Sequence, residues 1–189
     1  MDFYIAYEVD NPLNTFFYKP IEVSTNLLKA LLLEEKKLNP YKRYKFYFNL
    51  DGVNFSFIGK PVEIKDKEIT LMIEESHIEL RKYPRLKIPY PDIVVKIETL
   101  KGHLKDISLG GCRVQLEKPI SPYFLEKGFQ KIVEIELPNG KTFKVKAKIV
   151  NVMFTTKQIS CAFSEKSENV IKLYREVIDY LRKKLEEWD

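Results

Sequence analysis

Apolar and polar residues alternate between residues 93 and 163, and turns interrupt the alternation at short intervals. A period of two is that of a β-strand with one buried face. Between two of these runs, Asn139-Gly140 suits a type I′ hairpin turn. The alternation predicts six short strands in a small antiparallel barrel, which hides its strand edges by closing on itself. The six runs are residues 93–97, 104–107, 112–116, 133–137, 143–149 and 158–163.

A helix is predicted after the barrel, from about residue 168 to residue 187. Its apolar residues recur at helical spacing, so one face should pack on the barrel. A coiled-coil partner helix is the alternative, but roughly two heptads are too few to support it. The apolar residues are Val170, Ile171, Tyr174, Val177, Ile178, Leu181, Leu185 and Trp188.

The sequence predicts two domains: a small α+β domain at residues 1–78 and a barrel domain at residues 79–189. The leucine-rich segment 25–38 predicts a helix, with Ser24 or Thr25 as its cap. In residues 41–75, aromatic and β-branched residues alternate with polar ones around an Asp51-Gly52 turn, which predicts three short strands. The expected fold class is mainly β: a six-stranded antiparallel barrel with a C-terminal helix, preceded by a small α+β domain.

Composition narrows the class of protein. With 44% hydrophobic residues among 189, the chain can bury a core. The net charge of +5 favours an anionic partner only in general, because 27 acidic residues are interspersed with the basic ones. Cys112 and Cys161 each lie in an apolar run, which suits buried thiols in a reducing compartment, so a cytoplasmic location is expected.

Signatures of enzymes and of membrane proteins are missing from the sequence. His77 and His103 have no metal-ligand spacing with the cysteines, and no glycine-rich phosphate loop or nucleophile elbow occurs. We therefore expect no enzyme, no cofactor and no metal site. The amino terminus lacks a basic region, and Lys29 interrupts the longest apolar run, so neither a signal peptide nor membrane insertion is expected.

Two arginines, Arg81 and Arg85, stand four residues apart in the stretch RKYPRLKIPY. Pro84 removes a backbone donor and biases Tyr83 away from the helical region, so the stretch is expected to be extended. In an extended chain the two Cα atoms would be roughly 13 Å apart on one face, a span of nucleotide size. Because the chain has 32 Lys and Arg residues, this spacing alone decides nothing.

The stretch KDISLGGCRV is the second informative motif. A strand with Ile107 inward would turn at Gly110-Gly111, which leaves Asp106 and Ser108 on the outer face beside flexible backbone. A carboxylate can accept from the N–H groups of a guanine, and a hydroxyl and glycine amides can serve phosphate or base oxygens. Taken alone, the motif would be read as an ordinary Asp and Gly hairpin.

The two motifs together resemble the paired signature of PilZ domains, the bacterial receptors for cyclic di-GMP. The resemblance covers roughly residues 79 to 187, in which Arg81-x-x-x-Arg85 precedes Asp106-x-Ser108-x-x-Gly111. It implies that the arginines clamp the phosphates and Hoogsteen edges of the ligand. It also implies that Asp106 and Ser108 hold a guanine and that Gly111 permits close approach. The ligand-binding set expected from this resemblance is Arg81, Arg85, Asp106, Ser108, Gly110 and Gly111.

Two positions depart from the family pattern. Ser160 stands where the closing strand of many relatives has glycine, and Leu80 is not basic where a second stacked ligand would use a basic residue. One ligand per chain is therefore expected. The two-domain layout resembles PilZ proteins that act as flagellar brakes, which implies that ligand binding changes the arrangement of the domains and signals to a protein partner in motility or surface attachment.

Two alternatives remain at this point. A basic barrel could bind single-stranded nucleic acid through Lys144, Lys146 and Lys148 together with Tyr41, Tyr44 and Tyr47. The stronger interpretation is that the lysines form a solvated strand face and that the tyrosines cover the core of the small domain. A PilZ-like adaptor without a ligand is the other alternative. Against the adaptor stands the intact motif set, which an adaptor would have no physical need to keep.

Overall fold

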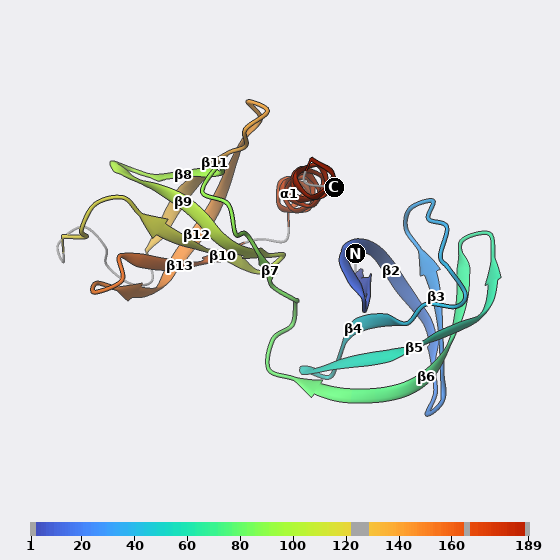
Figure 1. Ribbon diagram of the computed structural model, residues 1–189. Coiled ribbons are helices and arrows are strands. Elements are labelled where there is room, and N and C mark those ends of the chain that lie inside the picture. The colour runs from blue at the N-terminus through green and yellow to red at the C-terminus, as the bar shows by residue number, and fades with distance from the viewer. Residues whose placement is uncertain (1–2, 122–128, 165–166, 188–189) are drawn as a thin grey trace. The chain divides into compact units, whose positions relative to one another are not determined.

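The computed structural model describes residues 3–121, 129–164 and 167–187. The chain divides into two compact units, residues 1–83 and 84–189. Figure 1 shows that the first unit consists of strands and that the second combines strands with the helix α1 (Glu168–Glu186). Within each unit, the strands pair with one another in antiparallel fashion.

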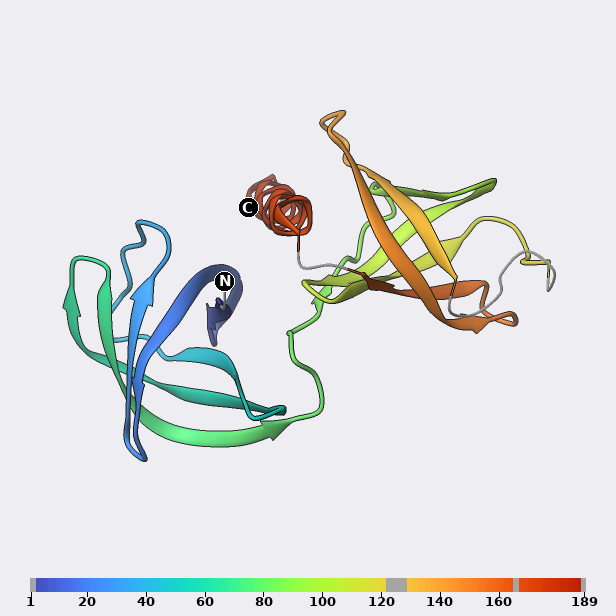
Figure 2. The ribbon, with the colours of Figure 1, turned by 180° about the vertical axis from the view of Figure 1, so that it is seen from behind.

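Six antiparallel strands form the first unit and close into a barrel in the order β1-β2-β3-β6-β5-β4 (Figures 1 and 2). The three strands predicted within residues 41–75 are confirmed as β4 to β6. Their first turn carries positive φ at both Asp51 (49°) and Gly52 (84°), the backbone of a type I′ hairpin. The strands are β1 (Tyr4–Glu8), β2 (Asn11–Val23), β3 (Leu27–Leu32), β4 (Tyr44–Leu50), β5 (Val53–Lys65) and β6 (Glu68–Glu79).

The expected helix at residues 25–38 is wrong, because this segment contains strand β3. Leu28, Ala30 and Leu32 are buried, while Leu27 and Lys29 are exposed, so the burial has a period of two. The leucine run fits either period, but β3 pairs with β2 on one side and β6 on the other, which satisfies its backbone. An isolated helix of this length is only marginally stable in water. The N-terminal unit is therefore a β-barrel and not an α+β domain.

Aromatic side chains fill the first barrel. Tyr18 and Phe46 are fully buried and meet edge to face, with ring centroids 4.8 Å apart. The Tyr18 hydroxyl donates to the carbonyl of Tyr47 over 2.6 Å, and the hydroxyl of buried Tyr44 accepts from the Asn39 backbone over 2.8 Å. Each buried phenol therefore has a hydrogen-bond partner, which removes the cost of placing it in the core.

The second unit confirms the predicted six-stranded barrel. Its sheet runs β10-β13-β12-β11-β8-β9-β7, and the additional pairing of β10 with β9 closes six of these strands into a ring. The two-residue strand β7 adds to β9 beside β8. The strands are β7 (Leu86–Lys87), β8 (Val94–Ile97), β9 (Leu100–Ser108), β10 (Gly111–Leu116), β11 (Gln130–Glu136), β12 (Thr142–Met153) and β13 (Gln158–Phe163).

The predicted hairpin between β11 and β12 is present, but its turn is not type I′. A type I′ turn needs positive φ at both central residues, and of Asn139 and Gly140 only Gly140 has it. Gly140 donates its N–H to the carbonyl of Leu137 over 2.9 Å. Pro138, with its fixed φ, favours an ordinary turn that ends in the left-handed Gly140.

Helix α1 confirms the helix predicted for the end of the chain. Ser167 caps it, because its hydroxyl accepts from the Val170 N–H. One face is buried, and the helix contacts β12, so it covers the barrel as expected. Trp188, counted in the predicted apolar face, lies outside the described residues. Within the described ranges no helix is both long and apolar enough to span a membrane.

Candidate functional site

The hairpin of β9 and β10 brings the second motif together. Its register places Ser108 opposite Gly111 and Asp106 opposite Arg113, with Ile107 opposite Cys112 between them. Residues directly opposite in an antiparallel pair share one face of the sheet. Ile107 and Cys112 point into the core, so Asp106 and Arg113 project from the other face.

Asp106 is the centre of the site. It is 2% exposed, although it lies on the face away from the barrel core. Its Oδ2 lies 2.5 Å from a terminal guanidinium nitrogen of Arg113, and its Oδ1 lies 3.6 Å from one of Arg85. Burying a carboxylate is costly unless cations compensate it, and the two arginines supply that compensation.

The two carboxylate oxygens of Asp106 differ in their bonding. The 2.5 Å contact of Oδ2 with Arg113 is a close ion pair. The 3.6 Å contact of Oδ1 with Arg85 is too long for a hydrogen bond, and buried Oδ1 has no hydrogen-bond partner in the described chain. Oδ1 can therefore accept a hydrogen bond from an added donor.

Strand β7 brings Arg85 to this place. Leu86 pairs with Ile107 and Lys87 pairs with Asp106, so the residue immediately before the pairing begins is Arg85. The N–H of Ile88 continues the ladder by donating to the carbonyl of Lys105 over 2.9 Å. The Arg85 side chain is 38% exposed, so it reaches both Asp106 and solvent.

Ser108 and Gly110 form the turn of the hairpin. The Gly110 N–H donates to the Ser108 hydroxyl over 3.2 Å, and that hydroxyl donates to the carbonyl of Gly111 over 3.4 Å. Ser108 is 8% exposed, so neither it nor Asp106 has the open outer position that the sequence suggested. Ser108 is paired with Gly111 at the turn, and the guanidinium groups of Arg85 and Arg113 contact the Asp106 carboxylate.

Gly111 has a packing role that the motif alone did not show. A Cβ at this position would lie 2.2 Å from the backbone oxygen of Cys161 on β13. Gly111 pairs with Ala162, and only a residue without a side chain allows the two backbones to pack this closely. The glycine is therefore required by the strand packing, whatever it contributes to a ligand.

Arg81 belongs to the first unit, whereas Arg85 belongs to the second. Residues 80–83 are neither helix nor strand, and Arg81 and Leu80 are both exposed. Neighbouring Lys82 lies 5.7 Å above the ring of Tyr83, a cation–π contact. The second unit brings together five of the expected residues, Arg85, Asp106, Ser108, Gly110 and Gly111. The sixth, Arg81, belongs to the first unit.

Arg113 is the site residue that the sequence reasoning missed. In the alternating run 112–116 it is simply the polar residue between Cys112 and Val114. Counting outward from the turn would have revealed it, because a hairpin that pairs Ser108 with Gly111 necessarily pairs Asp106 with Arg113.

The face expected for single-stranded nucleic acid is not formed as that alternative required. Tyr44 is fully buried and Tyr47 is 7% exposed, so only Tyr41 of the three tyrosines offers an open ring. Lys144 on β12 lies 3.5 Å from Glu134 of β11, which neutralises part of the lysine row. The tyrosines serve the core of the first barrel instead.

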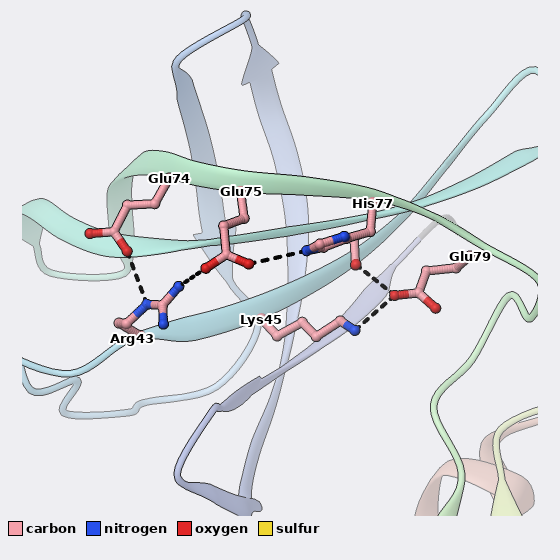
Figure 3. A network of polar contacts seen from close by, with 7 residues as sticks. Arg43, Lys45, Glu74, Glu75, His77 and Glu79 are labelled. Carbon is pink, nitrogen blue, oxygen red and sulfur yellow. Dashed lines mark hydrogen bonds and ion pairs between the residues drawn. The ribbon is translucent and has the colours of Figure 1, made fainter.

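A second polar cluster lies on the first barrel (Figure 3). Arg43 contacts both Glu74, over 2.9 Å, and Glu75, and Lys45 lies 2.7 Å from Glu79. Burial raises the pKa of Glu79, but hydrogen bonds from Lys45 and Ser56 outweigh it, so its pKa lies below the usual range. Cations thus compensate these β6 carboxylates, and the cluster has the character of a cross-strand brace.

The two cysteines face each other inside the second barrel. Cys112 on β10 pairs directly with Cys161 on β13, and both are free and buried, as the sequence suggested. A hydrogen bond with Cys161 and burial together raise the pKa of the Cys112 thiol well above its usual value. Nowhere in the described ranges do three His, Cys, Asp or Glu residues gather as metal ligands.

Several solved structures resemble the chain at low identity. MrkH of K. pneumonia in complex with c-di-GMP is 16% identical, with 96% of this chain and 90% of that chain covered and a TM-score of 0.45. The inhibitor of motility of Bacillus subtilis is 17% identical, with 98% and 97% covered and a TM-score of 0.42. YcgR of Escherichia coli in complex with c-di-GMP is 15% identical, with 98% and 86% covered and a TM-score of 0.44.

The family assignment comes from a different comparison. None of the curated proteins matches the chain. A model of the PilZ domain, however, matches residues 79–181, which is more than half of the sequence and contains all six residues of the expected ligand-binding set. The chain belongs to the PilZ domain family.

Proposed function

We propose that this protein is a receptor for cyclic di-GMP, which it binds through Arg81, Arg85, Asp106, Ser108, Gly110 and Gly111. The observation that carries the proposal is Oδ1 of Asp106, a buried carboxylate oxygen with no hydrogen-bond partner in the described chain. Leaving such an acceptor unsatisfied is costly, so its presence points to a missing donor. PilZ domains are receptor domains without catalytic activity, and membership of this family confirms the expectation that the chain is no enzyme.

A guanine can supply the missing donor. Its Watson-Crick edge presents N–H groups, which a carboxylate accepts, whereas the flat guanidinium of an arginine can bond to O6 and N7 or to phosphate. Arg85 is half-exposed and held at Asp106 only by a long ion pair. It is therefore free to leave Asp106 and to bond to the nucleotide at little cost.

Isothermal titration of the purified chain with cyclic di-GMP tests this function, with linear pGpG and GTP as controls. Saturable binding selective for the cyclic form is the expected result, with one ligand per chain because Leu80 offers no charge to a second molecule. Absence of heat from folded protein free of co-purified ligand would contradict the proposal and favour an adaptor.

Replacement of Arg85 tests the site. Arg85→Ala should weaken binding by about 1.5 to 3 kcal/mol, or roughly 10- to 150-fold, the usual scale of a charge-assisted hydrogen bond. Arg182→Ala is the matched control, because Arg182 pairs with Asp179 on α1 and has no part in the proposed site. Equal affinities of the wild-type and Arg85→Ala chains in calorimetry would refute the assignment.

We further propose that ligand binding changes the arrangement of the two units and signals to a protein partner, in motility or surface attachment. Support comes from the sequence positions of Arg81 and Arg85, which fall on opposite sides of the boundary between residues 83 and 84. A ligand that binds both arginines would favour one arrangement over others by differential affinity. Small-angle scattering should therefore change when cyclic di-GMP is added, and identical profiles would count against this mechanism.

A further inference from the structure

Arg113 makes the shortest polar contact of the candidate site, yet it is not one of the residues expected to bind the ligand. We propose that Arg113 is a positioning residue for the nucleotide: it holds Asp106 through Oδ2, so that Oδ1 remains an oriented acceptor for guanine and Arg85 remains free for the ligand. This inference rests on the proposed function and assigns that site an additional residue.

The asymmetry of the two arginines supports this division of roles. Arg113 approaches Oδ2 to 2.5 Å, whereas Arg85 stays 3.6 Å from Oδ1. If both arginines served only to neutralise Asp106, neither oxygen would need to lack a hydrogen bond. Instead Oδ2 is held in a close ion pair, and buried Oδ1 has no hydrogen-bond partner in the described chain. A fixed carboxylate with one open oxygen needs no rearrangement when a donor arrives, which lowers the cost of binding.

The secondary structure also separates the two arginines. Arg113 lies within β10, which pairs with β9 on one side and β13 on the other. Arg85 precedes the two-residue strand β7, which pairs with β9. The arginine on a strand paired along both edges is suited to a fixed contact, and the arginine beside a short strand is suited to movement.

Guanidinium chemistry is well suited to this position. The Nε of Arg113 is buried without a hydrogen-bond partner in the described chain, while its side chain remains 37% exposed. A terminal nitrogen of the planar fork contacts Asp106 while the group keeps further donors, an arrangement that the point charge of a lysine cannot reproduce.

A double-mutant cycle separates positioning from general stabilisation. Arg113→Gln is compared with the wild type, and the same change is then made in an Asp106→Asn background, with cyclic di-GMP affinity measured by calorimetry. In the wild-type background we expect a loss of roughly 10- to 100-fold. In the Asp106→Asn background we expect little further loss, because Arg113 acts through the Asp106 carboxylate.

Two controls test whether the effect is specific to Arg113, and a third measurement tests folding. Arg182→Gln removes an arginine from an ion pair elsewhere in the second unit and should leave affinity unchanged. Arg113→Lys keeps the charge and should restore affinity in part, and thermal melting without ligand verifies that each variant is folded. If Arg113→Gln does not fold, the cycle is run with Arg113→Lys, for which a smaller loss is again expected only when Asp106 is present.

The outcomes distinguish this inference from the proposed function. Wild-type protein that does not bind cyclic di-GMP would overturn the function and the role of Arg113 with it. Wild-type protein that binds, together with Arg113 variants of unchanged affinity, would overturn the positioning role alone. An equal loss in both backgrounds would also overturn it, because Arg113 would then act independently of Asp106.

Discussion

Gly111 belongs to the PilZ motif and is also required by the packing of the barrel. The absent side chain lets the backbone of β10 lie against that of β13, since a Cβ would be 2.2 Å from the Cys161 oxygen. Asp106 and Arg113 lie on the same pair of strands, so a shift at Gly111 would also displace their ion pair. Loss of binding on replacing this glycine would therefore not prove that it touches a ligand.

Replacing Gly111 should cost stability before any ligand is added. Gly111→Ala is expected to lower the free energy of unfolding by roughly 3 kcal/mol, because backbone must move to admit the methyl group. Gly140→Ala is the control within the same unit: Gly140 has φ +84° but nothing within 4 Å of a built Cβ. It should cost only about 1 kcal/mol, the price of a left-handed alanine. Urea unfolding measures both, and equal costs would contradict this explanation.

Among the elements, β3 shows most clearly how the barrel selects a strand. Leu28→Ala removes a fully buried side chain and should cost about 2 to 5 kcal/mol, whereas Leu27→Ala, at a position 41% exposed, should cost less than about 1 kcal/mol. Leu32→Ala should repeat the large loss. Urea unfolding of the three variants tests the period of two, and a large loss for Leu27→Ala would contradict it.

The contrast between the two barrels explains which strands could be predicted from the sequence and which could not. In the second barrel, Val145, Ala147 and Ile149 alternate with lysines, so only a period of two fits and each strand could be predicted. In β3 the outward residues are mostly leucines, and the local pattern permits both a helix and a strand. Pairing with β2 and β6 makes the choice, and such long-range pairing is not visible in a short stretch of sequence.

The candidate site was predictable to a similar degree. Asp106 and Ser108 could be identified from the spacing of the motif, because the chain order of a hairpin fixes which residues adjoin the turn. Their burial could not, since it depends on β7 returning to β9 and bringing Arg85 with it. Arg113 could be found only after the register of the hairpin was known.

Among the residues that the structure describes, buried phenols are concentrated in the first unit. Burial raises the pKa of Tyr18 well above its usual value, and it raises the pKa of Tyr44 and Tyr47 in the same direction. A phenol whose pKa is raised on folding stabilises the folded state fully below its unfolded pKa of about 10. This contribution is lost as the pH rises through the higher folded value, so the molecule should be sensitive to alkali.

Tyr18→Phe tests this sensitivity, because it removes the phenol and leaves the ring. At about pH 8 the variant should be less stable by about 1 kcal/mol, since the carbonyl of Tyr47 loses its 2.6 Å hydrogen bond. Between about pH 8 and about pH 10.5 the wild type should lose more stability than the variant. In the wild type, the Tyr18 phenol ionises in the unfolded chain before it can ionise in the folded core, whereas the variant has no phenol at this position. Tyr41→Phe removes a phenol at a position 86% exposed, so it is the matched control and should follow the wild type. Urea unfolding at the two pH values measures the difference, and parallel losses in the wild type and Tyr18→Phe would show that alkali acts elsewhere.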